Sequence, residues 1–433
     1  MKKLIILVLG IAMLPFSSGA QNSSSIDLKN LFGDLRARHI GPALMSGRIN
    51  DMEVHPTNNQ IIYAGTAGGG VWKSNDAGTT FNPIFDDHSQ SIGAVAIDPN
   101  DPDNVIYVGT GETWTRNSVS YGDGLYKSTD GGSNWKKLGF DKSERIANII
   151  VNPKNSKEVY VAVLGALWSD SDERGVFKSS DGGETWSKIL YVDKKTGAAD
   201  MTIDPKDPSI LYVSMWEFRR TGWSFESGGE HSALYKSTDA GKTWKKTLFL
   251  SDSTGCIDLA IHPSAPNIVY AAMWQRIRRP NKRQYGGESC GIYRSVDSGN
   301  TWVELTDGLP KKDIGRIGLA LADSEPNVLY SIYANEEGYF KGIYKTEDGG
   351  SEWKKCRDTP LKDIYMSYGW WFGNIRVNPT DSDEVYALGL DIWRSKNGGQ
   401  NWKNLSWQGV HYDQHALFIH PESPNLIVLG NDG

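Results

Sequence analysis

Aromatic and charged side chains gather in the segments that separate short runs of β-branched residues. These segments bring tryptophans next to arginines in the sequence, and they vary in length. Rigid indole rings beside guanidinium groups are typical of surfaces that bind sugars or peptides. For any single tryptophan the alternative is a packing role, in which the ring plugs a channel or holds loops together. The candidate ligand-binding residues are Trp114, Arg116, Trp168, Trp216, Arg219, Arg220, Trp223, Trp274, Arg276, Trp370 and Trp371.

Two carboxylates in segments of the same kind are candidates for acid–base chemistry. Glu112 lies two residues before Trp114, and Asp432 lies in the run Gly430-Asn-Asp-Gly433. Glycoside hydrolysis uses two carboxylates, about 5–5.5 Å apart for retention or about 6.5–9.5 Å apart for inversion. The spacing does not show that Glu112 and Asp432 converge, so the sequence leaves the catalytic residues open.

His411, Asp413 and His415 alternate along one short run. Alternate residues of a strand point the same way, which would place three metal-binding side chains on one side. The run continues into the apolar segment 416–419, however, where polar groups that line a channel commonly bond one another. We therefore expect no metal and no cofactor.

One motif of eight residues, Ser/Thr-x-Asp-x-Gly-x-x-Trp, repeats along the chain, with Phe81 ending its first copy and Asn397 replacing the acid in its last. Successive copies are 49 to 58 residues apart. The carboxylate can accept turn N–H groups, and the glycine tolerates a positive φ. Seven equivalent positions cannot form one active centre, so we expect a structural role for them. The acidic positions are Asp76, Asp130, Asp181, Asp239, Asp297 and Asp348.

Three further strands accompany each motif. A run such as Leu125-Tyr-Lys127 precedes it, a run such as Val105-Ile-Tyr107 comes earlier, and before that a strand ends in an X-Pro turn such as Asp98-Pro99. No window has a sustained helical period. Repeated four-stranded antiparallel units of this length predict an all-β protein, a β-propeller of seven complete blades and a partial eighth. Because the last unit stops after two strands, we expect a fragment of a longer chain.

The two faces of such a propeller differ in loop length. The X-Pro turns and the repeated motifs lie on one face and hardly vary, whereas the loops between the second and third strands lie on the other and are longest in units 2 to 5. Functional loops commonly extend from a rigid scaffold in this way. The sequence therefore predicts that a glycan or peptide ligand binds at the face with the long loops.

The repeated motif resembles the Asp-box (BNR) repeat, which sialidases, xyloglucanase-type endoglucanases and the sortilin/Vps10 ectodomain share. The opening residues Arg38-His-Ile-Gly-Pro42, Ser46-Gly-Arg48 and Ala64–Trp72 resemble those of secreted bacterial proteins with a sortilin-N-terminal-like propeller. The resemblance extends from Arg38 to the end of the sequence. It implies the propeller fold strongly and a function only weakly.

The resemblance can be tested at the catalytic positions. No Arg-Ile-Pro motif of the sialidase kind occurs. The xyloglucanase-like family places a catalytic Asp between the Thr after the second strand and the Gly-Gly that enters the third. Unit 1 has Ala67 there, whereas unit 8 has Asp432. Our main hypothesis is therefore a binding module for a glycan or peptide, and the alternative is a glycoside hydrolase that acts on a polysaccharide through two carboxylates in the channel.

Composition and the N-terminal residues define the setting. The 433 residues carry 46 Lys+Arg and 52 Asp+Glu, a net charge of −6, which argues against a nucleic-acid partner. Lys2 and Lys3 precede the apolar run 4–16, which is too short to span a bilayer and is typical of a secretory signal. We expect a signal peptide at 1–20, an extension at 21–47 and the propeller at 48–433. We also expect export without membrane insertion after cleavage.

The three cysteines are too few for a disulfide scaffold. We expect buried thiols, with a Cys256–Cys290 bridge as the alternative.

Overall fold

The computed structural model describes residues 47–113, 119–279, 281–406 and 410–433. All of them belong to one compact unit, Pro42–Gly433. The described chain is almost entirely β-strand, and its single helical element is the 3-10 helix η1 (Thr359–Leu361). No helix in this part is long and apolar enough to cross a bilayer. The expected signal peptide lies outside the described residues, as does all but the last residue of the expected extension.

Seven antiparallel sheets, each with four main strands, follow one another along the described chain. We call them blades 1 to 7 and their main strands A to D in chain order. Blade 1 holds β1 (Ile49–Val54), β2 (Ile62–Thr66), β3 (Val71–Ser74) and β4 (Asn82–Pro83); blade 2 holds β5 (Ile92–Ile97), β6 (Ile106–Thr110), β7 (Leu125–Ser128) and β8 (Lys136–Gly139); blade 3 holds β9 (Ile146–Asn152), β10 (Asn155–Val163), β11 (Gly175–Ser179) and β12 (Ser187–Leu190); blade 4 holds β13 (Thr196–Ile203), β14 (Leu211–Arg220), β16 (Ala233–Ser237) and β17 (Lys245–Leu248).

The remaining blades have the same order of strands, with additions in the B–C loops of blades 4 and 5. Blade 5 holds β18 (Thr254–Ile261), β19 (Val269–Gln275), β22 (Gly291–Ser295) and β23 (Val303–Leu305); blade 6 holds β24 (Ile317–Leu321), β25 (Leu329–Ala334), β26 (Phe340–Thr346) and β27 (Lys354–Lys355); blade 7 holds β28 (Asn374–Asn378), β29 (Asp381–Leu388), β30 (Ile392–Ser395) and β31 (Lys403–Asn404). The additions are β15 (Phe225–Ser227), which pairs with β14, and the hairpin β20 (Ile277–Arg279)–β21 (Lys282–Gln284).

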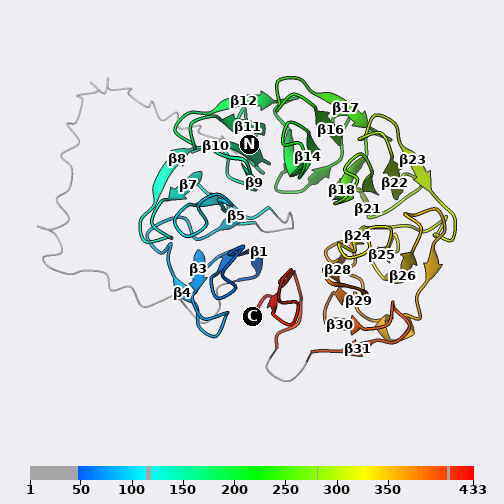
Figure 1. Cartoon of the computed structure of the whole chain (residues 1–433). Coiled ribbons are helices and arrows are strands. Elements are labelled where there is room, and N and C mark those ends of the chain that lie inside the picture. The colour runs from blue at the N-terminus through cyan, green and yellow to red at the C-terminus, as the bar shows by residue number, and fades with distance from the viewer. Residues whose placement is uncertain (1–46, 114–118, 280, 407–409) are drawn as a thin grey trace, which may run out of the picture. The chain divides into compact units, whose positions relative to one another are not determined.

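A two-stranded sheet ends the described chain and lies against the first blade. It consists of β32 (Ala416–Ile419) and β33 (Ile427–Gly430). Its β32 contacts both β28 and β1, and the N–H of Ile49 donates to the carbonyl of Asn431 over 3.2 Å. The blades surround a central channel, with the A strands innermost (Figure 1). The structure therefore confirms the predicted β-propeller of seven four-stranded blades and a partial eighth.

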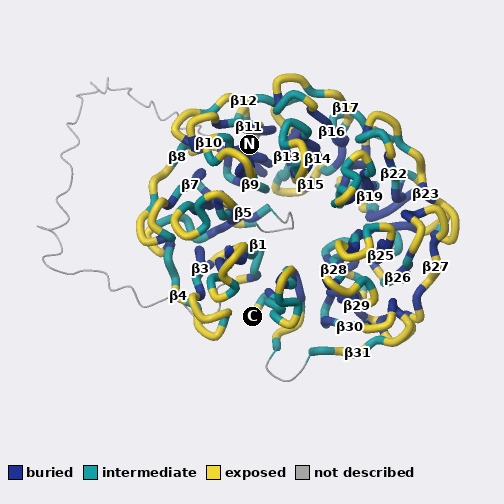
Figure 2. Tube along the Cα trace, in the orientation of Figure 1, coloured by how far each residue is buried: buried dark blue, intermediate teal, exposed yellow. Residues whose placement is uncertain are grey.

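Burial follows the position of a strand within its blade. The B strands are buried almost throughout, as in β6 and β19, whereas the D strands at the outer edge are largely exposed (Figure 2). Apolar clusters fill the spaces between neighbouring blades, which explains why the B strands are apolar on both faces. All three cysteines are buried free thiols, as expected, so no Cys256–Cys290 bridge forms.

Each repeated motif forms a closed turn between strands C and D. In blade 3 the Ser179 hydroxyl donates to Asp181 over 2.7 Å and accepts the Gly183 N–H over 2.8 Å. Asp181 also accepts the N–H and the hydroxyl of Thr185 over 2.9 and 2.6 Å. These hydrogen bonds hold the pKa of Asp181 well below its usual value. Its carboxylate is thus engaged by its own turn.

The same turns also join neighbouring blades. The Tyr107 hydroxyl and the Lys127 ammonium of blade 2 both donate to the Gly182 carbonyl of the blade 3 turn, over 3.0 and 2.8 Å. The blade 1 pair Tyr63 and Lys73 donates to Gly131 of blade 2 in the same way. We call this recurring arrangement the blade lock.

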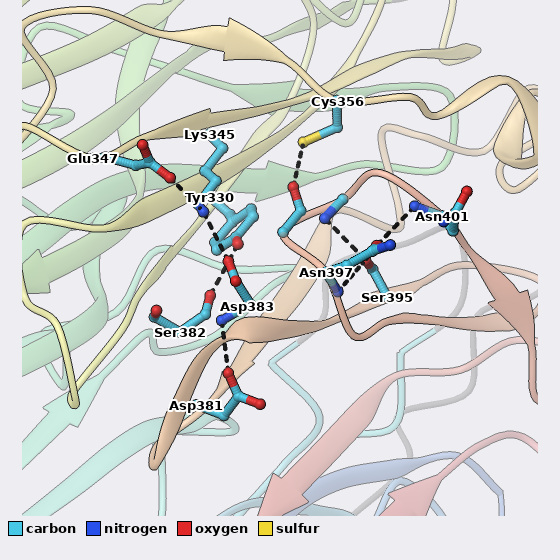
Figure 3. A network of polar contacts seen from close by, with 12 residues as sticks. Tyr330, Lys345, Glu347, Cys356, Asp381, Ser382, Asp383, Ser395, Asn397 and Asn401 are labelled. Carbon is cyan, nitrogen blue, oxygen red and sulfur yellow. Dashed lines mark hydrogen bonds and ion pairs between the residues drawn. The ribbon is translucent and has the colours of Figure 1, made fainter.

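The lock between blades 6 and 7 has a different form. Lys345 contacts both Glu347 and Asp383, over 2.7 and 2.9 Å, and the Tyr330 hydroxyl donates to the Ser382 carbonyl (Figure 3). Asn397 of the blade 7 turn lies nearby in the same view. It takes the place of the acid by accepting the Asn401 N–H over 2.9 Å.

Candidate functional site

Three charged residues and one histidine from the first, second and last sheets meet at one end of their strands. Arg48 and His415 each immediately precede an A strand, β1 and β32. Glu112 and Asp432 each lie two residues beyond the end of a B strand, β6 and β33. Because the start of strand A and the end of strand B share one edge of an antiparallel sheet, all four lie on the face that carries the B–C loops. We call it the loop face, and the opposite one the box face.

These side chains form a chain of ionic contacts around Arg48. Nη1 of Arg48 bonds Oε1 of Glu112, and Nε lies 3.7 Å from Oδ1 of Asp432. Nε2 of His415 lies 2.7 Å from the same Asp432 oxygen. The Arg48 guanidinium also lies 5.7 Å from the centre of the Trp371 ring. We call these five residues the rim cluster.

Aromatic packing fixes the imidazole of His415. The ring stacks on Phe372 with centroids 5.7 Å apart and meets Trp371 edge-on at 5.9 Å. Asn374 donates to the His415 carbonyl over 2.7 Å, which also anchors the backbone. His415 is buried by these contacts, so its Nε2 is held in place against Asp432.

Asp413 and Asp432 have pKa values shifted in opposite directions. Burial raises the pKa of Asp413, and the nearby charge of Asp432 raises it further. Burial also acts to raise the pKa of Asp432, but the hydrogen bond and charge of His415, with the charge of Arg48, bring it below its usual value. Asp432 is therefore ionised at an acidic pH at which Asp413 still holds a proton, the pattern of an acid–base pair.

Glu112 and Asp432 differ in their access to a ligand. The residue Glu112 is only 1% exposed, and its backbone N–H donates to the Ser91 hydroxyl over 3.0 Å. The side chain of Asp432 is 29% exposed. Glu112 thus acts as a counter-ion of Arg48, whereas Asp432 can meet a molecule at the loop face.

The alternating run 411–415 does not form one ligand set. The imidazole Nδ1 of His411 lies 2.6 Å from the Tyr412 carbonyl and the residue is exposed, whereas His415 is buried against Asp432. Asp413 has a positive φ of 70°, which turns it away from regular strand geometry. In the described part of the chain no group of three His, Cys, Asp or Glu side chains could hold a metal ion.

A cavity of about 390 Å³ occupies the channel and shares Trp371 with the rim cluster. Four carboxylates of inner strands line it: Asp51, Glu53, Asp200 and Asp258. Enclosure by protein raises the pKa of Asp51 to about 6 and of Glu53 to about 8. It also raises the pKa of Asp200 to about 6, although this side chain faces the open space of the cavity.

Some of these polar groups join neighbouring blades. Asp51 accepts the Val95 N–H of blade 2 over 2.8 Å, and Asp258 accepts the Leu319 N–H of blade 6 over 2.9 Å. Asn148 donates to Asp200 of blade 4 over 2.9 Å. Asp51, Asp200 and Asp258 thus each have a hydrogen-bond partner in a neighbouring blade.

Two of the predicted ligand-binding tryptophans pack the loops. Trp216 and Trp274 are buried, and their indole N–H groups donate to the Ser227 hydroxyl over 3.1 Å and the Tyr285 carbonyl over 2.7 Å. Trp370 stacks on Tyr285 with centroids 5.2 Å apart. All three tryptophans line the channel cavity.

Two other predicted tryptophans are open to solvent. Trp168 is 45% exposed and Trp223 is 79% exposed. The Arg220 guanidinium lies 5.6 Å from the centre of the Trp168 ring, and Arg219 lies 3.5 Å from Asp170. The structure thus places an exposed tryptophan–arginine surface on the loops around blades 3 and 4. Trp114 and Arg116 lie outside the described residues.

Sequence reasoning missed Arg48 and the channel carboxylates, although a signal for three of these carboxylates was present. An Asp or Asn recurs five residues before the proline of the X-Pro turn in five of the units. The residues at this position are Asp51, Asn148, Asp200, Asp258 and Asn374. Arg48 also belongs to a recurring position, because Arg145 and Arg316 likewise stand directly before an A strand. Its partners could not be predicted, because they come from blades that are distant in the sequence.

Comparison with known proteins adds sequence evidence. A family model described as sortilin, neurotensin receptor 3, matches residues 123–257. A xyloglucanase from a Paenibacillus species is 23% identical over 410 residues, which cover 80% of this chain and 37% of the relative. An oligoxyloglucan-reducing end-specific xyloglucanase from Emericella nidulans is 21% identical and covers 89% of this chain and 55% of its own length. A sortilin from Danio rerio is 27% identical over 117 residues.

Solved structures agree on the fold. The xyloglucanase from Xanthomonas campestris matches with a TM-score of 0.55 at 18% identity, over 83% of this chain and 53% of its own. The Niastella koreensis enzyme matches with a TM-score of 0.53 at 20% identity, over 83% of this chain and 54% of its own. This chain therefore spans about half or less of the length of these xyloglucanases. It is a β-propeller related to xyloglucanases.

Proposed function

We propose that this chain takes part in the hydrolysis of a polysaccharide at its loop face, with Asp432 as the ionised carboxylate and Asp413 as the proton donor. The observation that carries the proposal is the opposite shift of their two pKa values, with the charge of Asp432 acting on Asp413. Asp432 also occupies the position at which the xyloglucanase-like family has a catalytic Asp. The sequence relationship to xyloglucanases over most of the chain favours this function over a pure binding module.

The chemistry follows from the protonation states. A protonated Asp413 can give its proton to the oxygen of the leaving sugar, and an ionised Asp432 can act as the base or nucleophile. His415 and Arg48 keep Asp432 ionised, because both contact the same carboxylate oxygen. The half-buried Trp371 supplies an apolar face beside them, against which a sugar ring can pack.

The same shifts predict an acidic optimum. Below the pKa of Asp432, which is lower than the usual value of about 3.9, the base is protonated and activity is lost. Above the raised pKa of Asp413 the acid loses its proton, and activity falls again. We expect a bell-shaped profile centred between these two values.

A second candidate function is glycan binding without cleavage. Ala67 stands where the related enzymes have one of their carboxylates, and Glu112 is buried in an ion pair with Arg48. The exposed Trp168 and Trp223 can bind a sugar chain without any acid or base. A peptide ligand is supported only by the short match to sortilin.

One experiment separates these functions. Xyloglucan and other soluble β-glucans are incubated with the wild-type chain, Asp432→Asn and Asp413→Asn, and new reducing ends are measured beside binding in affinity gels. We expect cleavage by the wild type only, with binding retained by both variants. Binding without cleavage by the wild type would establish the second candidate. Failure to bind any glycan, while an acidic or aromatic peptide binds, would contradict both.

The proposal also includes export of the chain and the domain boundaries predicted from its sequence. The basic and apolar opening of the sequence predicts removal of residues 1–20 during secretion. N-terminal sequencing of the protein recovered from outside the cytoplasm should begin near Gln21. Recovery of the uncleaved chain from the cytoplasm would contradict export.

A further inference from the structure

The channel cavity has an aromatic and cationic side that the proposed acid–base pair does not use. Arg276 directly follows strand B of blade 5, and Arg316 directly precedes strand A of blade 6, so both lie toward the loop face. Both residues line the cavity of about 390 Å³, together with Trp216, Trp274 and Trp370. Cavities of this size and aromatic character are typical of small-ligand sites.

Arg276 is a buried cation without a hydrogen-bond partner for most of its donors. The residue is 5% exposed, and neither Nε nor Nη2 bonds any group in the described part of the chain. The guanidinium lies 5.1 Å from the Trp274 ring centre and 5.0 Å from that of Phe225. Buried arginines are normally paired with a carboxylate, so this arrangement needs an explanation.

Three guanidinium groups lie near these two rings. The Arg278 guanidinium lies 5.8 Å from the centre of the Phe225 ring, and that of Arg316 lies 5.9 Å from the centre of the Trp274 ring. Burial, with the charges of Arg278 and Arg316, lowers the pKa of Arg276 to about 9. Because this value still lies above neutral pH, Arg276 remains a cation there. In the described part of the chain, no salt bridge joins Arg276 to a carboxylate. Arg316, in contrast, is near Asp258.

We propose that Arg276 binds the carboxylate of an acidic sugar, a uronic acid residue of the polysaccharide, in the channel cavity. A carboxylate accepts from a guanidinium in a directional, charge-assisted pair, which is strong in a partly enclosed site. The indole faces of Trp274 and Trp370 would contact the apolar face of the same sugar ring. This inference rests on the proposed function, since it names the class of polysaccharide that the loop face receives.

A matched pair of probes tests the inference. Cellotetraose and its tetramer analogue with C6 oxidised to the carboxylate differ only in that group. We expect the wild-type chain to bind the oxidised tetramer at least tenfold more tightly by calorimetry. Arg276→Gln should abolish this preference while leaving the affinity for cellotetraose unchanged, and Arg276→Lys should keep part of it. The exposed Arg279→Gln, on the hairpin that follows Arg276, is the control and should keep the full preference.

The outcomes distinguish this inference from the proposed function. Equal binding of the two tetramers, or a preference that survives Arg276→Gln, would overturn the acidic-sugar site while cleavage of neutral β-glucan could still support the hydrolase. A preference for a carboxylated peptide over both tetramers would assign the site to peptides instead and overturn the sugar. Melting temperatures provide the structural readout: Arg276→Gln should melt no lower than the wild type, because it removes an unpaired buried charge. A large drop, together with loss of cellotetraose binding, would make Arg276 a packing residue.

Discussion

The box face and the loop face of this propeller are built from the same blades by opposite means. On the box face, the same turn and the same tyrosine–lysine pair recur from blade to blade, as at Gly131 and Gly182. On the loop face, Arg48, Glu112 and Asp432 come from three different sheets and contact one another through their side chains. Repetition thus marks what holds the blades together, and the departures from it mark where this chain can act on another molecule.

The carboxylates of the two faces also differ in their pKa values. The turn carboxylate of Asp239 accepts hydrogen bonds from its own loop, and these lower its pKa to about 2. At the loop face one carboxylate, Asp413, has a raised pKa and its neighbour Asp432 a lowered one. A set of carboxylates whose pKa values are all lowered is suited to stability, whereas two pKa values shifted in opposite directions are suited to proton transfer.

The largest expected effect is on the rim cluster. Asp432→Asn removes the ionised carboxylate but keeps its size, so cleavage of a β-glucan should fall by about 10²–10⁴-fold. The box-face variant Asp239→Asn, measured in the same reducing-end assay, should keep its turnover. Equal losses from the two changes would remove the functional contrast between the faces.

A smaller effect is expected from the exposed tryptophans. Trp223→Ala removes a 79% exposed ring, so it should leave the melting temperature unchanged while it weakens glycan binding about thirtyfold, or about 2 kcal/mol. Affinity gels with immobilised polysaccharide measure the change. Lys242→Ala, a solvent-facing change on the box face, is the matched control. If that variant loses binding and Trp223→Ala does not, the ligand-binding face has been assigned wrongly.

The blade lock should affect stability alone. Tyr107→Phe removes one of the two donors to the Gly182 carbonyl and leaves Lys127 as the other. Losing one buried hydrogen bond of this kind should lower the free energy of unfolding by about 1 kcal/mol, with glycan affinity unchanged. Chemical denaturation reports the first quantity and the affinity gel the second. A variant that is fully stable yet binds poorly would contradict the structural role of the box face.

The smallest effect concerns pH. The pKa of Glu53 is raised to about 8 in the folded protein, mainly by burial and then by the Asp51 charge, against about 4.3 when unfolded. The folded state therefore holds this proton longer, and the stability it contributes is complete below about pH 4.3 and lost as the pH rises through about 8. Glu53→Gln should melt like the wild type at pH 4 and above it at pH 8.5, unlike the exposed Glu337→Gln. Parallel curves for wild type and Glu53→Gln would mean that Glu53 ionises freely in the channel.

The fold could be predicted because its causes are local and repeated. Each motif such as Ser179–Trp186 closes its own turn, and each B strand carries its own apolar run. Seven copies of a local signal leave little freedom in topology. The blade lock could not be predicted in the same way, since Tyr107 and Gly182 are paired only once the blades stack.

The candidate site was predictable only in part. Asp432 could be found from its place after the second strand of unit 8, but the contacts that shift its pKa come from Arg48 and His415. The sequence predicted a ligand-binding role for both Trp216 and Trp223, although Trp216 is buried and Trp223 is exposed. Strand order fixes the face on which a loop residue lies, whereas only packing decides whether its ring points out or in.

Hydroxyl-radical footprinting with and without a xyloglucan oligosaccharide tests the central claim most directly, because it reports both faces in one experiment. The account predicts protection of Trp168, Trp223 and Trp371 on the loop face, with unchanged modification of Trp186 and Trp244 in the box turns. Protection confined to the box turns, or no protection at any tryptophan at saturating oligosaccharide, would contradict the claim that the loop face is the functional face of this propeller.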